Sequence, residues 1–160
     1  MRLGNRNGKL VRRNGEIHLG KQTSKRRGEL AEMEFMIRAA KHGFGVAKPY
    51  GDSDRYDFIV DGGARLWRVQ VKSSSRLSQG TYFIASQRCC NGTAIPYTAR
   101  EIDYLAAYVF PEDAWFIIPV RAFVPRTSLH LFPEERGKVG MYARYREAWE
   151  LLRGERLIGE

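Results

Sequence analysis

Two short segments on either side of a glycine turn constrain the fold of this chain more than any other feature. Residues 55–60 and 66–72 each read as a β-strand, and Asp61-Gly62-Gly63 lies between them. Glycine reaches positive φ at little steric cost, so this spacing predicts a tight β-hairpin. Antiparallel pairing within the hairpin would bring Asp57 toward the Gln70 end of the second strand.

The second strand of this hairpin has two chemically different faces. Side chains two residues apart on a strand point the same way, so Gln70 and Lys72 project together. The opposite face is apolar and can hold the strand on a core through Trp67, Val69 and Val71. One carboxylate from Asp57, one amide and one ammonium would then share a small volume.

This mixture of groups suits the hydrolysis of a phosphodiester bond. A hard cation such as Mg²⁺ prefers oxygen ligands and keeps several waters, so Asp57 and Gln70 could supply its protein ligands. The cation would lower the pKa of a bound water and neutralise the charge that builds on the phosphorus oxygens. Lys72 could orient the attacking water or help to remove its proton, while its charge stabilises the transition state.

At these residues the chain resembles the PD-(D/E)XK nuclease superfamily, with Tyr56-Asp57 at the PD position and Gln70-Val71-Lys72 at the (D/E)XK position. Tyr56 replaces a proline that is not a ligand in the superfamily. Gln70 replaces the usual second acid and brings no negative charge, so metal affinity should fall or the requirement for Mg²⁺ should become stricter. The resemblance implies an α/β fold with a restriction-endonuclease-like core, in which helices flank a central mixed β-sheet.

The Gln-X-Lys form of the motif is similar to one branch of the superfamily, which contains a group I intron-encoded homing endonuclease. Further likeness lies at residues 51–57, at Tyr97, and at residues 102–105 and 117–120. It implies a homing-type endonuclease that cuts double-stranded DNA with Mg²⁺, for which Mn²⁺ would substitute, and that works as a homodimer or homotetramer. A Holliday junction resolvase with the same site is the nearest alternative. A DNA-binding protein that lost catalysis through Gln70 is another.

An amphipathic helix is predicted ahead of these strands, at residues 28–42. Its apolar positions recur at helical spacing, at Leu30, Met33, Ile37 and Ala40, with Met36 beside them. Glu29 and Glu32 also lie on it, and by themselves they would be read as solvated acids near a positive helix end. In the superfamily a helix glutamate follows a glycine by four residues, as Glu32 follows Gly28. The resemblance therefore implies that Glu32 holds the metal or positions the water, with Glu29 as the fallback.

Positive charge is concentrated at the start of the chain. Residues 1–27 carry nine of the 27 Lys and Arg residues and the single acid Glu16, so they account for +8 of the net charge of +9. We expect a basic arm over residues 1–24 and a nuclease domain over residues 25–160. The cations expected to contact DNA are Lys25, Arg26 and Arg27. Neutralised phosphates release counterions, but basic arms also raise solubility or bind membranes and ribosomal RNA, so charge alone leaves the partner open.

The rest of the chain reads mostly as strands. Strand-like runs are predicted at residues 44–47, 56–60, 66–72, 81–85, 104–109 and 115–120, with a short strand at 16–19. A second amphipathic helix is predicted at residues 141–152, with Tyr145, Trp149 and Leu152 on its apolar stripe. Residues 87–100 form a long connection. We expect Tyr97 and Arg100 to lie near the scissile phosphate, although a solvated loop explains this segment equally well.

Composition sets the remaining bounds. A chain of 160 residues with 43% hydrophobic content can bury one normal core but hardly two. No apolar run approaches membrane-spanning length and no secretion signal is recognisable, so we expect a cytoplasmic protein with no membrane partner. Ser73-Ser74-Ser75 directly follow Lys72. Their hydroxyls could bond a phosphate, yet termination of the strand explains them as well.

Overall fold

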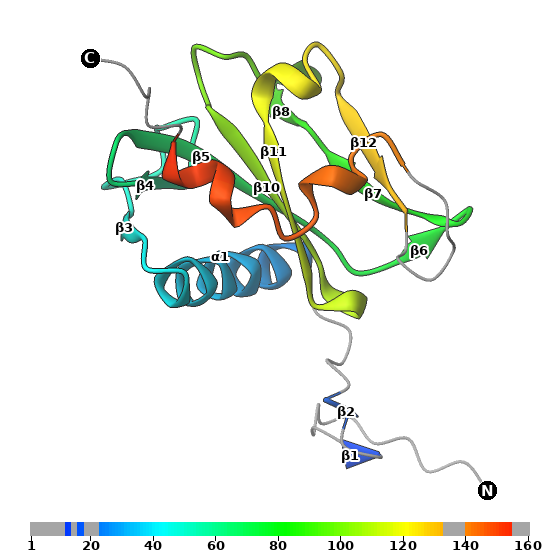
Figure 1. Ribbon diagram of the computed structural model, residues 1–160. Helices are drawn as coiled ribbons and strands as arrows, with labels where there is room; N and C mark the ends of the chain where they lie inside the picture. Colours follow the sequence, from blue (N-terminus) through cyan, green and yellow to red (C-terminus); the bar gives the residue numbers. More distant parts are fainter. Residues whose placement is uncertain (1–11, 14–15, 18–22, 133–139, 155–160) are drawn as a thin grey trace, which may run out of the picture.

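A five-stranded mixed β-sheet forms the centre of the computed structural model, which describes residues 12–13, 16–17, 23–132 and 140–154 (Figure 1). In order across the sheet, its strands are β11 (Ala114–Pro119), β10 (Tyr104–Val109), β5 (Leu66–Ser74), β4 (Phe58–Asp61) and β3 (Gly45–Ala47). β10 and β5 are parallel, and the other neighbours are antiparallel. This sheet confirms the predicted α/β class with a central mixed sheet.

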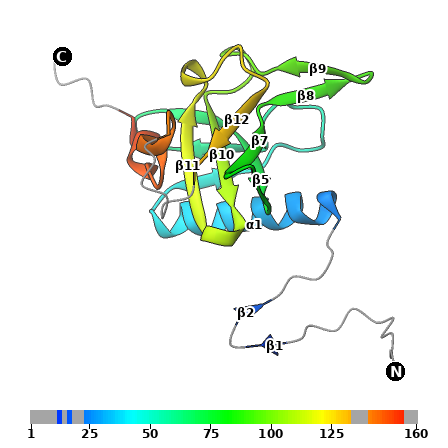
Figure 2. The ribbon, with the colours of Figure 1, turned by 90° about the vertical axis from the view of Figure 1, so that its right-hand side faces the viewer.

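A helix and a smaller sheet lie on the two faces of this central sheet. One face is covered by α1 (Ser24–Lys41), and the other by a smaller sheet of β12 (Ser128–Leu131), β7 (Thr81–Ala85) and β6 (Leu77–Ser78). Two separate ribbons pair β8 (Gln87–Cys90) with β9 (Thr93–Pro96), and β1 (Arg12–Arg13) with β2 (Glu16–Ile17). Short 3-10 turns are η1 (Phe110–Glu112), η2 (Val120–Ala122), η4 (Ala143–Tyr145) and η5 (Trp149–Arg153). In Figure 2 the β8–β9 ribbon projects from the side of the domain away from α1.

Two hydrophobic clusters sandwich the central sheet. Alternate residues of β10 serve the two sides: Tyr104, Ala106 and Tyr108 join the cluster under α1, while Leu105, Ala107 and Val109 join the cluster under the smaller sheet. Every residue of β10 and β11 is buried, as expected for strands that are covered on both faces. The hairpin of β4 and β5 is thus anchored beside a rigid, fully buried pair of strands.

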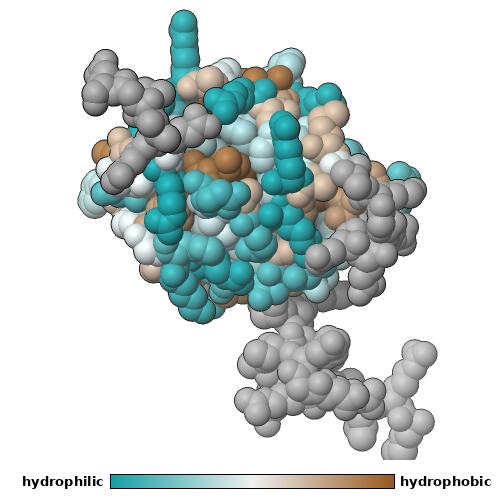
Figure 3. All heavy atoms as spheres, in the orientation of Figure 1, coloured by the Kyte–Doolittle hydropathy of each residue, from teal (hydrophilic) through white to brown (hydrophobic). Residues whose placement is uncertain are grey.

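The helix α1 begins four residues earlier than predicted and buries a different stripe. Its buried residues are Ala31, Phe35 and Ala39, which are spaced by four. The predicted stripe was wrong, because Met33, Met36 and Ile37 are 41%, 37% and 50% exposed. Protein interiors are close-packed, so small alanines let the helix approach the sheet while one large Phe35 fills the space between them. Elsewhere the surface seen in Figure 3 is mostly hydrophilic, with hydrophobic residues in small patches.

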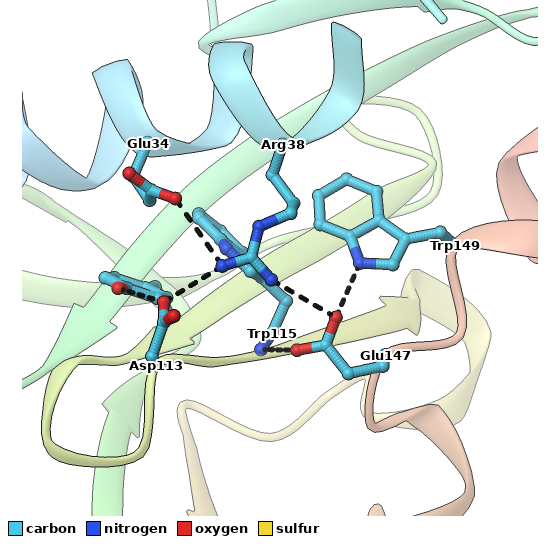
Figure 4. Close-up of polar contacts among 7 residues, drawn as sticks. Glu34, Arg38, Asp113, Trp115, Glu147 and Trp149 are labelled. Atoms are coloured by element: carbon cyan, nitrogen blue, oxygen red, sulfur yellow. Dashed lines mark hydrogen bonds and ion pairs between the residues drawn. The ribbon is translucent and has the colours of Figure 1, made fainter. Parts of the chain in front are cut away.

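A polar network fixes α1 against the end of the chain. Arg38 of α1 forms ion pairs with Glu34 at 3.5 Å, Asp113 at 2.9 Å and Glu147 at 3.7 Å (Figure 4). Glu147 also accepts hydrogen bonds from the indole N–H of Trp149 at 2.9 Å and from the backbone N–H of Trp115 at 2.7 Å. These contacts join the helix to β11 and to η5, and so they fix the height of the helix above the sheet.

The predicted C-terminal helix is absent. Instead of one helix at residues 141–152, the chain forms the separate turns η4 and η5. Between them Glu147 has φ of 51°, which an α-helix does not tolerate, and its backbone N–H bonds the carbonyl of Trp115 at 2.7 Å. Tyr145, Trp149 and Leu152 are buried as expected, but Tyr145 lies in the cluster under the smaller sheet and the other two lie under α1.

The predicted strands at residues 44–47, 56–60, 66–72, 81–85, 104–109 and 115–120 are confirmed to within two residues at each end. The predicted connection at residues 87–100 is mostly a β-hairpin, which turns at Asn91 and Gly92 with φ of 49° and 78°. Of the expected strand at residues 16–19, β2 is described and residues 18–19 lie outside the described part. The division into an arm and a domain stays a prediction. No helix among the described residues is long and apolar enough to cross a membrane.

Candidate active site

The β4–β5 hairpin places Asp57 against Gln70, as the sequence predicted. Phe58 pairs with Val69, so the preceding residue Asp57 lies opposite the next position of β5. The backbone N–H of Asp57 donates to the carbonyl of Val69 at 2.9 Å. In return, Oδ2 of Asp57 accepts hydrogen bonds from Nε2 of Gln70 at 2.6 Å and from the backbone N–H of Val71 at 2.7 Å. The carboxylate is therefore held by two donors from the motif strand.

The turn of this hairpin is fixed by contacts that only glycine permits. Oδ1 of Asp61 accepts a hydrogen bond from the backbone N–H of Gly63 at 2.8 Å, and Gly63 has φ of +86°. A Cβ atom on Gly62 would lie 1.9 Å from the carbonyl oxygen of Leu152. That same oxygen accepts a hydrogen bond from the indole N–H of Trp67 at 2.8 Å. The register that aligns Asp57 with Gln70 is thus fixed at the turn.

Gln70 and Lys72 lie on one face of β5, while Val69 and Val71 enter the core under α1. Gln70 is only 8% exposed. Its amide nitrogen lies 2.6 Å from Oδ2 of Asp57 and 3.3 Å from the carbonyl oxygen of Val71. One NH₂ group therefore lies between an oxygen of the residue before β4 and a carbonyl oxygen of β5 itself.

Lys72 is half-buried beside Tyr97. Its Nζ lies 5.8 Å from the centre of the Tyr97 ring, and Tyr97 is 4% exposed. Burial lowers the pKa of Lys72, and the nearby charges of Asp57 and Glu32 partly oppose that shift. Burial, followed by the charge of Asp57, raises the pKa of Tyr97 to about 12, so its phenol stays protonated. Tyr97 is therefore part of the wall of the site and does not lie on an exposed loop.

Glu32 approaches this group from α1. Its Oε2 accepts a hydrogen bond from Nζ of Lys48 at 2.6 Å, and this bond raises the pKa of Lys48. Burial raises the pKa of Asp57 against its bond from Val71, and the charge of Glu32 adds to the rise. Glu29 instead forms an exposed ion pair with Arg26 at 3.3 Å. Of the two glutamates considered, Glu32 is therefore the one that lies near Asp57.

Lys48 is a charged neighbour of the site that the sequence analysis missed. It follows β3 directly, and its Nζ also lies 5.7 Å from the ring of Phe58, the residue after Asp57. No spacing or motif marks it, because it comes from a strand outside the hairpin. Only the pairing of β3 with β4 brings it beside the helix.

The cations that were predicted to contact DNA lie at two places, the first turn of α1 and the segment before β10. Thr23 caps α1 by accepting a hydrogen bond from the backbone N–H of Arg26 at 3.2 Å, so Lys25, Arg26 and Arg27 occupy the first helical turn. Lys25 and Arg26 are exposed and Arg27 is half-buried. The side chain of Arg100 is exposed too, while its carbonyl oxygen accepts a hydrogen bond from Arg68.

Arg68 holds the segment that carries Tyr97 and Arg100 in place. Its guanidinium donates to both carboxylate oxygens of Asp103 at 3.1 Å and to the carbonyl of Ala99 at 3.1 Å. Burial acts to raise the pKa of Asp103, but the hydrogen bonds from Arg68 outweigh it and lower that pKa. Arg68 thereby ties β5 to the end of the hairpin segment.

Comparison with known proteins decides the family. The sequence pattern described as PD-(D/E)XK endonuclease matches residues 22–152. This chain belongs to the PD-(D/E)XK endonuclease family. The family was predicted from Tyr56-Asp57 and Gln70-Val71-Lys72, and both segments lie inside the matched span. The chain is accordingly an endonuclease by family.

Solved structures refine this assignment. A bacterial homing endonuclease, I-Ssp6803I, is 31% identical, with a TM-score of 0.73, over 82% of this chain and 94% of the other. This likeness confirms the restriction-endonuclease-like core and the predicted branch of the family. Hjc of Archaeoglobus fulgidus, a Holliday junction resolvase, is 17% identical, with a TM-score of 0.45, over 72% of this chain and 87% of the other. No curated protein sequence matches the chain.

The donor atoms of this PD-(D/E)XK site fit a hard divalent cation. Among the described residues, no three His, Cys, Asp or Glu side chains converge into a metal cluster. The nearby donors are instead the carboxylates of Asp57 and Glu32, the carbonyl of Val71 and the amide of Gln70, all oxygens of the kind that Mg²⁺ prefers. The Gln70 NH₂ group lies where it contacts two of these oxygens at once, which is a position suited to positive charge.

Proposed function

We propose that this chain is a Mg²⁺-dependent endonuclease that hydrolyses phosphodiester bonds in double-stranded DNA. The observation that carries the proposal is the contact of Gln70 with Asp57 at 2.6 Å, on the face of β5 that also bears Lys72. An acid, an amide and a lysine that are distant in sequence share one volume there. An ordinary solvated Gln-X-Lys pair would leave residue 70 exposed, whereas Gln70 is 8% exposed.

Asp57, Glu32 and Gln70 would hold the metal. When bound, the metal would supply an acidified water and positive charge opposite the phosphorus oxygens. Asp57 is oriented for this task by its bond from the Val71 backbone, which engages Oδ2, and Oδ1 would bind the metal. Gln70 would turn its amide so that the oxygen, not the nitrogen, points toward Asp57. Mn²⁺ should substitute, because it accepts the same oxygen ligands.

Lys72 would orient the attacking water and help to remove its proton. Burial lowers the pKa of this lysine, which brings its neutral form closer to the working pH, where general bases act best. Tyr97 would limit the movement of the ammonium by packing its ring 5.8 Å from Nζ. Glu32 would support either the metal or the water.

The DNA would cross the surface that carries Lys25, Arg26 and Arg27, with Arg100 on another side of the site. The relative that is 31% identical is named a homing endonuclease, which favours a long duplex substrate for this chain as well. Cutting both strands would require a homodimer or homotetramer, and the exposed Met33, Met36 and Ile37 of α1 offer an apolar surface for such contacts. The cytoplasmic location stays a prediction.

Plasmid nicking tests the proposal. Supercoiled plasmid should be nicked with Mg²⁺ and left intact with EDTA, and Lys72→Ala should slow nicking by about 10²–10⁴-fold, the usual contribution of a general acid or base. Lys41→Ala is the matched control, because Lys41 is an exposed lysine at the far end of α1. Unchanged nicking by Lys72→Ala would refute the assigned chemistry. DNA binding without nicking by the wild-type chain would establish the inactive DNA-binding alternative.

The choice between a duplex and a branched substrate needs its own comparison. A synthetic four-way junction and a linear duplex of the same sequence should be incubated with the enzyme and Mg²⁺ under identical conditions. We expect cleavage of the duplex, at one site in a long target. Cleavage confined to the junction would make the chain a Holliday junction resolvase and would contradict the homing-type assignment.

A further inference from the structure

A polar hollow lies beyond Lys72, where β5 passes the first turn of α1. It has a volume of about 410 Å³ and is lined by Arg27, Arg76, Phe83 and four serines at positions 73, 74, 75 and 78. None of the described residues that line it is acidic. We propose that this serine–arginine hollow binds a backbone phosphate of the DNA strand that is being cut, next to the scissile linkage. The inference rests on the proposed function and adds a contact that the catalytic group does not supply.

The hollow takes serines from both faces of β5: Ser74 lies on the face of Gln70 and Lys72, and Ser73 lies on the face toward α1. Gln70, Lys72 and Ser74 are spaced by two and therefore share one face of this strand. A strand rises about 3.3 Å per residue, so Ser74 lies about 7 Å beyond Lys72. One strand of DNA advances about 3.4 Å per nucleotide along the helix axis, and its successive phosphates are farther apart because the backbone winds around that axis, so this step corresponds to about one or two nucleotides. A strand whose linkage faces Lys72 would thus bring a neighbouring phosphate over the hollow.

Arg27 reaches the hollow because of its phase on α1. It lies four residues before Ala31, and the buried stripe continues through Phe35 and Ala39. Arg27 is therefore on the side of the helix that faces the sheet, at the end where the apolar layer stops. Beneath that end, the side of β5 that faces α1 changes from Val69 and Val71 to Ser73. At this end of α1, serine hydroxyls and arginine guanidinium groups therefore replace the apolar side chains that separate α1 from β5 elsewhere.

The chemistry of the lining selects an anion. Guanidinium groups bind phosphate through several N–H donors at once, and serine hydroxyls add short donors beside them. Phe83, which is 50% exposed, provides an apolar wall that suits a sugar or a base edge. Strand termination does not account for Ser73 and Ser74, because β5 continues through them: Ser73 pairs with Tyr108 and Ser74 with Val109.

Arg76→Ala is the direct test, since Arg76 is exposed and its loss should not unfold the domain. Binding to a duplex should be measured in EDTA, where no cleavage occurs, at salt concentrations from 50 to 300 mM. Each lost phosphate contact lowers the slope of log K against log salt by about 0.9, and we expect this change together with a loss of affinity of about three- to tenfold. Arg76→Lys keeps the charge and should retain most of the slope. Arg121→Ala removes a similarly exposed arginine from η2 and should change neither quantity.

The outcomes separate the hollow from the proposed function. If the wild-type chain nicks plasmid but Arg76→Ala and Arg121→Ala have equal slopes, the hollow does not bind DNA, while the nuclease proposal stands. A wild-type chain that neither nicks nor binds DNA would end both proposals. Inorganic phosphate at 5 mM should leave the melting temperature of wild type and Arg76→Ala equally unchanged. A rise confined to the wild type, without an effect on DNA binding, would make the hollow a site for free phosphate and would overturn the inference.

Discussion

Gln70→Glu is the most informative single substitution in this protein. It restores the second acid of the family motif at a position that is 8% exposed and 2.6 Å from a carboxylate oxygen of Asp57. Without a metal, the substitution replaces a hydrogen bond with two negative charges in contact. With a metal, it adds a charged ligand. The folded state should therefore lose stability in EDTA and regain it with Mg²⁺ or Mn²⁺.

The folded variant can keep both acids charged or can bind a proton on one of them. The less costly of these two states sets the loss of stability. Two charges about 3.5 Å apart repel by about 5 kcal/mol at an effective dielectric constant of about 20. Protonating the new glutamate at pH 7, from its usual pKa of about 4.3, costs about 3.7 kcal/mol. Protonation costs less free energy than the repulsion does. The protonated side chain also donates a hydrogen bond to Asp57, of about the strength of the one that Gln70 donates in the wild type. The free energy of unfolding should therefore fall by about 3–4 kcal/mol in EDTA at pH 7.

The pH dependence has a defined sign. The pair of acids has a folded-state pKa above the unfolded value, so the folded state retains a proton that the unfolded state has released. The free energy of unfolding therefore falls as the pH rises from the unfolded-state pKa to the folded-state pKa. Within that pH range, each pH unit of acidification restores about 1.4 kcal/mol. The variant should be closer to wild type at pH 5.5 than at pH 7.

Thermal unfolding in EDTA and in excess Mn²⁺ checks these values. For a chain of this size, about 3 kcal/mol corresponds to a fall of about 6–12 °C in melting temperature. Mn²⁺ at 100 times its Kd would return about 2.7 kcal/mol. Gln79→Glu, in the exposed turn before β7, is the control and should melt within about 2 °C of wild type. Equal melting of Gln70→Glu and Gln79→Glu in EDTA would show that residue 70 does not face Asp57, and the site as described would be wrong.

Two further predictions concern the helix and the working pH. Phe35→Ala should lower the free energy of unfolding by about 3–5 kcal/mol in urea titrations, because the centre of its buried ring lies 5.3 Å from that of Phe58 and 5.4 Å from that of Trp115. Met33 is 41% exposed, so Met33→Ala should lower it by less than about 1 kcal/mol. Equal losses in the two variants would contradict the assigned buried face of α1. The nicking rate should fall on acidification, beginning above the usual pKa of an aspartate, because burial raises the pKa of Asp57 and a protonated acid cannot hold the cation. A rate that is flat between pH 4 and pH 8 would contradict that assignment.

The hairpin and the catalytic motif could be predicted because their information is local. Alternation along residues 66–72 assigns each side chain to a face, and the glycine turn sets the register that aligns Asp57 with Gln70. Both features act within about 15 residues of sequence. Resemblance to the family supplied the choice of Glu32 over Glu29, since helical spacing alone places both acids on accessible positions.

The features that were missed depend on contacts between distant segments. The buried stripe of α1 is selected by how closely the helix can approach the sheet, which favours Ala31 and Ala39 over the more apolar Met33 and Ile37. Lys48 carries no motif and joins the site only through strand pairing. The predicted C-terminal helix is interrupted at Glu147, because the backbone N–H of Glu147 bonds the carbonyl of Trp115 in β11 instead of a carbonyl within a helix. The Asn91-Gly92 turn, by contrast, was a local hairpin signal that could have been recognised.

The joining of α1 to η5 also bears on when the protein acquires activity in the cell. Translation delivers the helix early and its packing partners Trp149 and Leu152 more than a hundred residues later, and domains fold as their parts emerge. Until residues 147–152 leave the ribosome, Arg38 has no Glu147 to bind, and the packing that fixes α1 over the sheet is incomplete. We therefore expect the nuclease site to form only after this segment has been made, so a chain that stops before residue 147 should not nick DNA.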